Sequence, residues 1–176
     1  MERPIRLVSE PIVEAAAVDE SASFEAFVLD QHPRLFGALC LLTGDRYEAE
    51  EIAQDAFVRI FEKWERVSGL EDPTGYLFRT AMNVFRKRYR RAALAFRRAV
   101  HVAPVDGGFA AVEDREVVVR ALMRIPVDQR AALVVTSLLG YPSEEAARIL
   151  GANPSTVRAR ATRARAALRE EIGDDR

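Results

Sequence analysis

A segment without lysine or arginine separates two stretches that have a helical sequence pattern. Residues 99–114 read AVHVAPVDGGFAAVED, a composition of glycine, proline and small side chains that is typical of a linker. On either side apolar residues recur at helical spacing, and strand-like runs bounded by hairpin turns are missing. The sequence predicts an all-α fold of two small helical domains joined by a flexible linker. The expected parts are a disordered tail at 1–21, a domain at 22–98, the linker at 99–113 and a second domain at 114–171.

The composition suits a globular protein and excludes several other classes. Of the 176 residues 49% are apolar and the net charge is −1, so the chain can build a core and does not resemble a disordered protein. The single cysteine, Cys40, cannot form a disulfide within the chain. We see neither an apolar stretch of membrane-spanning length nor a cationic leader. We expect a cytoplasmic protein with no membrane insertion.

Seven helices are expected from periodicity and from start and stop signals. Asp72 followed by Pro73 is a favourable helix start, and Gly140 and Gly151 are natural C-terminal stops. The expected helices are 23–42, with a break allowed near Pro33, then 47–67, 73–96, 114–124, 126–139, 143–150 and 154–171.

Carboxylates gather on one side of the helix expected at 47–67. At 100° per residue its apolar residues fall on one broad side, whereas Glu48, Glu51 and Asp55 fall on another. A metal site is disfavoured, because a carboxylate site in a helical bundle would need a histidine three residues after a ligating glutamate, and the two histidines are His32 and His101. The side is predicted to bind a protein, with a merely solvated acidic surface as the alternative.

Positive charge is concentrated in two blocks, 86–98 and 158–169, that contain no acid. Two such blocks predict two anion-binding surfaces. On the helix expected at 73–96 the polar side carries a basic strip with one amide in it, and a solvated helix face is the alternative. Tyr76, near the start of this helix, is a candidate for stacking on an unpaired base. The strip consists of Arg79, Asn83, Arg86 and Arg90.

Residues 143–163 have the layout of a helix-turn-helix. The short helix EEAARIL is followed by the turn GAN, and a second helix opens with Asn153 as cap and Pro154 as first residue. An inward stripe of Val157, Ala161, Ala164 and Leu168 leaves a polar side that can reach base edges and phosphates in a major groove. The alternative is a helical hairpin with a solvated, arginine-rich end. The candidate DNA contacts are Ser155, Thr156, Arg158, Ala159, Thr162 and Arg163.

The sequence lacks the residue patterns that are typical of catalytic sites. It has no Ser/His/Asp set, no phosphate-cradling glycine loop, no metal-ligand cluster and no cofactor fingerprint. We therefore expect no enzymatic activity of the chain on its own, no cofactor and no metal.

Two stretches together resemble the bacterial RNA polymerase sigma factors of the extracytoplasmic-function type. YEAEEIAQDAFVRIFEKW resembles that family's core-polymerase-binding helix, and DPTGYLFRTAMNVFRKRYRR resembles its helix for opening and reading the downstream promoter element. LMRIPVDQRAALVVTSLLGYPSEEAARILGANPSTVRARATRARAALR resembles its promoter-reading helix-turn-helix. The resemblance covers residues 22–98 and 114–170 and implies a sigma factor that directs core RNA polymerase to specific promoters.

The resemblance also implies partners for the residues named above. It implies that the clamp coiled coil of the polymerase binds Glu48, Glu51, Gln54 and Asp55. The downstream element, once melted, would meet the basic strip and Tyr76, while duplex upstream DNA would meet the polar side of the second helix of the helix-turn-helix. An anti-sigma factor is a further candidate partner.

Two other functions are compatible with the same patterns. One is a stand-alone helix-turn-helix transcriptional regulator whose N-terminal domain dimerises or senses a signal. The other is an adaptor whose arginine blocks bind acidic protein. A regulator binds promoter duplex unaided, whereas a chain of net charge −1 that acts as a sigma factor is expected to need the polymerase.

Overall fold

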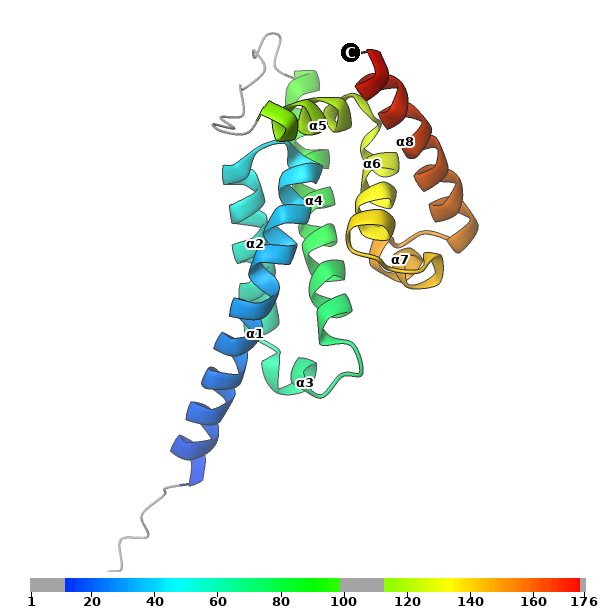
Figure 1. Ribbon diagram of the computed structural model, residues 1–176. Helices are drawn as coiled ribbons and strands as arrows, with labels where there is room; N and C mark the ends of the chain where they lie inside the picture. Colours follow the sequence, from blue (N-terminus) through cyan, green and yellow to red (C-terminus); the bar gives the residue numbers. More distant parts are fainter. Residues whose placement is uncertain (1–11, 99–112, 175–176) are drawn as a thin grey trace, which may run out of the picture.

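The computed structural model describes residues 12–98 and 113–174, and all the regular elements in these ranges are helical (Figure 1). This confirms the predicted all-α fold. None of the described helices is long and apolar enough to cross a membrane. In chain order the elements are α1 (Ile12–Thr43), α2 (Arg46–Phe61), α3 (Trp64–Ser68), α4 (Pro73–Arg98), α5 (Glu113–Arg124), α6 (Val127–Leu133), the π-helical turn η1 (Val134–Leu138), α7 (Ser143–Leu150) and α8 (Pro154–Asp174).

The first domain is a bundle in which α1, α2 and α4 run side by side and α3 connects α2 to α4 at one end (Figure 1). Asp45 caps α2, because its side chain accepts hydrogen bonds from the backbone N–H groups of Tyr47 (2.7 Å) and Glu48 (3.1 Å). The predicted apolar side of α2 is buried against the bundle, and its members are Ala49, Ile52, Ala53, Ala56, Phe57 and Ile60.

Helix α1 differs from the prediction in its start and its continuity. It begins at Ile12, so residues 12–21 of the predicted disordered tail are helical, and it runs through Pro33 without a break. The Pro33 ring is exposed, while Leu35 and Leu39 in the following turns are buried and hold the helix on the bundle. Burial of these turns therefore outweighs the local preference of proline for a helix break.

The single helix predicted at 47–67 is in fact two helices. Its backbone leaves the helical conformation at Lys63 (φ −132°, ψ 17°) and re-enters it as α3. After this turn Trp64 packs against the rings of Phe24 (5.3 Å between centroids) and Phe27 (4.9 Å) of α1. The end of α2 thus coincides with an aromatic contact between distant parts of the sequence.

The second domain comprises α5 to α8, and its central contact is between α6 and α8. Arg130 of α6 is buried and donates hydrogen bonds to the carbonyls of Leu122 (3.0 Å) and Ile125 (3.5 Å). It therefore caps the C-terminal end of α5. The helix predicted at 126–139 changes to a π-helical turn at Val134, and the last helix continues to Asp174.

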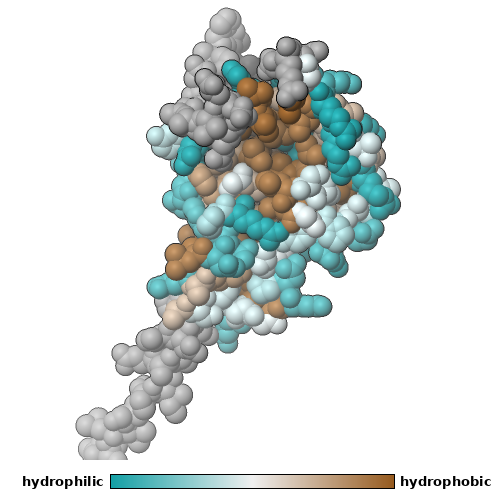
Figure 2. Space-filling view, viewed as in Figure 1, coloured by the Kyte–Doolittle hydropathy of each residue, from teal (hydrophilic) through white to brown (hydrophobic). Residues whose placement is uncertain are grey.

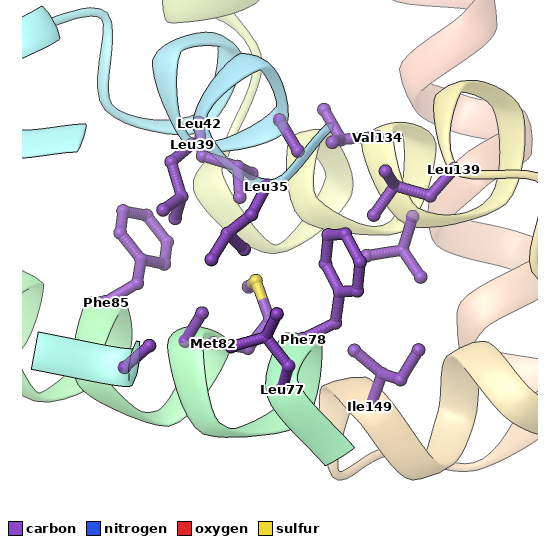
Figure 3. Packing of buried hydrophobic residues seen from close by; sticks show 14 of the residues in the cluster. Leu35, Leu39, Leu42, Leu77, Phe78, Met82, Phe85, Val134, Leu139 and Ile149 are labelled. Carbon is purple, nitrogen blue, oxygen red and sulfur yellow. The ribbon is translucent and has the colours of Figure 1, made fainter. Parts of the chain in front are cut away.

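The two domains share a hydrophobic core, which no sequence pattern indicates (Figure 3). Phe78 and Met82 of α4 lie in the same buried cluster as Leu139, which follows η1, and Ile149 of α7. The predicted pair of helical domains is confirmed, and their described parts pack against each other. Most of the predicted linker lies outside the described residues.

Gly75 allows a test of how α4 begins, and Gly37 of α1 provides a control. The Gly75 N–H donates to Asp72 Oδ1 (2.7 Å), and a Cβ at Gly75 would lie 1.9 Å from Asp72 Oδ2. Gly75→Ala should displace this cap, and because the cap is worth about 1 kcal/mol and alanine gains only about 0.5 kcal/mol over glycine in a helix, the free energy of unfolding should fall. Gly37 of α1 has open space around it, so Gly37→Ala should raise that energy by about 0.5 kcal/mol. Urea unfolding followed by circular dichroism measures both, and a shift of the two variants in the same direction would refute the steric role of Gly75.

Candidate protein and nucleic-acid interfaces

The acidic face of α2 consists of Glu48, Glu51, Gln54 and Asp55, which lie together in the structure. An arginine of a neighbouring helix lies against this face. Arg88 of α4 is ion-paired with Glu51, and its Nη1 lies 3.5 Å from Asp55 Oδ2. Burial raises the pKa of Glu48, an effect that Arg88 opposes. Glu51, Gln54 and Asp55 are exposed, so the face can meet a partner once Arg88 shares or gives up its contacts.

Apolar side chains that sequence reasoning missed lie on the outward side of the same helix. Tyr47, Val58 and Phe61 are 84%, 58% and 56% exposed. At 100° per residue they fall on the side of Gln54, next to the carboxylates. The signal in the sequence was apolar residues recurring on the otherwise polar side of an amphipathic helix. A protein that docks here would therefore bury apolar surface as well as pair with carboxylates.

The basic strip of α4 is interrupted at Arg86. Arg79, Asn83 and Arg90 are exposed, whereas Arg86 is half-buried and donates a hydrogen bond to the carbonyl of Leu150 at the end of α7. Burial lowers the pKa of Arg86. Three of the four strip residues are thus available at the surface, and the fourth is engaged with the second domain.

Tyr76 is half-buried beside the strip and already has a cationic neighbour. Arg66 Nη2 donates to the Tyr76 hydroxyl (3.0 Å), and its guanidinium carbon lies 5.9 Å from the ring centroid. A cleft of about 580 Å³ adjoins Tyr76 and Arg79, and Glu145 and Arg148 of α7 also line it. Its remaining wall includes the segment between α3 and α4, from Leu70 to Asp72.

The predicted helix-turn-helix is present as α7, a turn and α8. Gly151 ends α7 in the left-handed conformation (φ 56°, ψ 45°), which glycine adopts without strain. Val157, Ala161 and Ala164 of the predicted inward stripe are buried, and Leu168 is half-buried. The packing of α8 on the rest of the domain therefore follows the predicted side.

The outward side of α8 carries the candidate DNA contacts. Ser155, Arg158, Thr162 and Arg163 are exposed, while Thr156 and Ala159 are half-buried. Arg158 Nη1 lies 3.2 Å from Glu144 Oε1 of α7, and these side chains are 57% and 68% exposed. An ion pair with this much solvent exposure contributes little, so a phosphate or base can replace Glu144.

The two arginine blocks lack acids along the sequence but not in space. Arg88 contacts carboxylates of α2, Arg158 contacts Glu144, and Arg160 Nη2 lies 2.9 Å from Asp128 Oδ2 of α6. Within the part of the chain that the structure describes, no three His, Cys, Asp or Glu side chains are grouped to hold a metal ion.

Comparisons of the sequence identify the family of each domain. Residues 21–94 match the model for sigma-70 region 2, and residues 115–168 match the model for sigma-70 region 4. The chain is 31% identical over 163 residues to the ECF RNA polymerase sigma factor SigM of Mycobacterium tuberculosis, covering 92% of this chain and 83% of SigM. It is 28% identical over 151 residues to the sigma factor EcfG of Rhodopseudomonas palustris, with 80% of each chain covered.

Solved structures agree on the fold. The sigma factor RpoE of Bartonella quintana, solved with the anti-sigma factor NepR, superimposes with a TM-score of 0.72 at 25% identity over 88% of this chain and 99% of RpoE. CnrH, solved with the cytosolic domain of CnrY, has a TM-score of 0.65 at 24% identity over 93% of this chain and 96% of CnrH. Two matched domains in the order region 2 then region 4, together with these relatives, show that the chain belongs to the ECF sigma factors, the transcription initiation factors that direct RNA polymerase to promoters.

Proposed function

We propose that three surfaces of this sigma factor divide the work of promoter recognition. The acidic face of α2 binds the clamp coiled coil of core RNA polymerase. The basic strip of α4, with Tyr76 and the segment at 68–75 that runs from the end of α3 into the first turn of α4, holds the melted downstream element, and the outward side of α8 reads the upstream element as duplex. The observation that supports this division is that the exposed members of each residue set lie together on one side of a separate helix.

The charge of the chain supports a requirement for the polymerase. With 26 basic and 27 acidic residues, the whole chain gains little affinity for duplex from the release of counterions. Several of its arginines also have carboxylate neighbours. Promoter binding then depends on the polymerase, which holds both DNA-binding surfaces against the same stretch of DNA.

A stand-alone regulator is not favoured, because both the region 2 and region 4 models match the chain. Run-off transcription from a library of promoter fragments separates the two functions. We expect transcripts only when purified core polymerase and this chain are present together. A shift of promoter duplex by the chain alone, with no dependence on core polymerase, would contradict the proposal.

An anti-sigma factor and a cytoplasmic location are also part of the proposal. The RpoE structure that resembles this chain contains an anti-sigma factor, and the shared fold offers such a partner the same two domains.

Bacterial RNA polymerase works in the cytoplasm, so a factor that binds it acts there. The proposed role in promoter recognition involves no catalysis by the chain itself. The proposed domains are 22–98 and 114–171, joined by a linker at 99–113; helix α1 extends the first domain back to Ile12, α5 begins at Glu113, and α8 continues to Asp174.

Reversing the charge at Asp55 tests the acidic face. Asp55→Arg should abolish capture of core polymerase and leave the circular dichroism spectrum unchanged, because the Asp55 side chain is 51% exposed and its contact with Arg88 is long (3.5 Å). Glu65→Arg on α3 changes charge by the same amount outside the face and should still bind polymerase. Combining Asp55→Arg with Arg88→Asp restores an ion pair of opposite polarity. If this double variant binds polymerase as the parent does, Asp55 is structural and not a polymerase contact.

Replacing Arg158 tests the reading of duplex DNA. Arg158→Ala should weaken promoter binding by the holoenzyme by about 1–3 kcal/mol and relax the base preference at one position of the upstream element. Arg169→Ala, also on α8 but beyond the helix-turn-helix, serves as the matched control. Selection of promoter variants by the holoenzyme measures both effects. Equal weakening on all promoter sequences would instead assign Arg158 to a phosphate.

A further inference from the structure

Two arginines of the first domain donate hydrogen bonds to backbone carbonyls of the second. Arg34 Nη2 of α1 lies 2.5 Å from the carbonyl oxygen of Leu139, which follows η1. Arg86 of α4 donates to the carbonyl of Leu150, the last residue of α7. These contacts join residues 105 and 64 positions apart in the sequence, so they link the domains directly.

The chemistry of the two acceptors explains why arginine is suited to both positions. The last carbonyls of a helix have no intrahelical donor and carry partial negative charge, so a guanidinium at this end satisfies them and is favoured by the helix dipole. Arg34 gains further contacts, because its guanidinium carbon lies 5.6 Å from the ring centroid of Phe78 and 5.7 Å from that of Tyr141. Those two rings meet edge-on across the domain boundary at 6.0 Å.

The boundary between the domains is only partly close-packed. A pocket of about 280 Å³ that is open to solvent lies between α4 and α6, lined on one side by Phe85 and Tyr89 and on the other by Val127 and Ala131. Figure 2 shows apolar surface along this boundary, between more polar surfaces of the two domains. Side chains that face an open pocket lack packing partners on that side, so this part of the boundary contributes less to closure than a continuous core would.

We propose that Arg34 and Arg86 form a clasp that keeps the two domains closed in the polymerase-free chain and holds the Arg86 guanidinium away from DNA. The guanidinium of Arg86 cannot bind the Leu150 carbonyl and a phosphate with the same N–H groups. Opening of the clasp therefore completes the basic strip of α4. The DNA role of Arg86 rests on the proposed function, whereas closure by the clasp does not.

Thiol labelling measures opening without DNA or polymerase. Ala131 lies at the boundary and is 5% exposed, so an Ala131→Cys thiol should react slowly while the domains are closed and faster when they part. Arg34→Ala in this background should raise its labelling rate about ten-fold, the loss expected for a charge-assisted hydrogen bond. Arg59→Ala on α2, which removes a guanidinium from a groove between α2 and α4, is the matched control and should leave the rate unchanged.

Native Cys40 reports whether a variant has unfolded. Its side chain is fully buried in the first domain, so its labelling in chains that lack Ala131→Cys measures loss of that fold. We expect the Cys40 rate to be the same with and without Arg34→Ala. Equal labelling at position 131 in the Arg34→Ala and Arg59→Ala chains, or rapid labelling there in the parent background, would overturn the clasp.

Binding of the polymerase-free chain to a fluorescent single-stranded oligonucleotide tests what the clasp withholds. Arg34→Ala should tighten binding, and adding Arg86→Ala should remove the gain. Faster labelling with no change in DNA binding would support the clasp and remove Arg86 from the proposed DNA contacts. Tighter DNA binding with unchanged labelling would overturn the clasp, because the gain would then arise without opening.

Discussion

The packing of α4 determines how the functional surfaces are arranged. Its buried residues Leu77, Phe78 and Met82 belong to a core that contacts α2 on one side and α7 on the other. With these two sides of the helix covered, the exposed side carries Arg79, Asn83 and Arg90 of the basic strip. The same burial brings the second domain close enough for Arg86 to reach the end of α7. Surface charge and domain contact are therefore consequences of one buried helix.

Much of the fold could be predicted because each helix buries a side that repeats every 3.6 residues. The inward sides of α2 and α8 and the glycine at the end of α7 depend on local sequence alone, and they appear as expected. The features that were not predicted depend on contacts between distant residues. Trp64 ends α2 early to pack on α1, buried leucines carry α1 through Pro33, and Phe78 joins the domains.

In the candidate sites, too, local sequence predicts some features, and contacts between distant residues determine the others. Periodicity gathers Glu48, Glu51 and Asp55 on one side of α2, and these residues do lie together. Periodicity within one helix cannot show that Arg88 of another helix lies against them, nor that Arg86 points to a carbonyl of the second domain. A charge block read along the sequence thus identifies the helix that carries the charge. Which of its members remain available to a partner is decided by the helices packed beside it.

The internal contacts of its arginines limit how strongly this sigma factor, whose net charge is −1, binds DNA without a partner. An arginine that is bonded within the protein must lose that bond before it binds phosphate, so its net gain on DNA is smaller than that of a solvated arginine. Arg86, Arg88 and Arg158 all start from internal contacts. The contacts of Arg88 are with the acidic face of α2, so a polymerase that occupies this face competes with Arg88 for the same carboxylates. Binding of the polymerase would then release positive charge on α4, the helix that also carries the basic strip, and so couple docking to an increase in affinity for DNA.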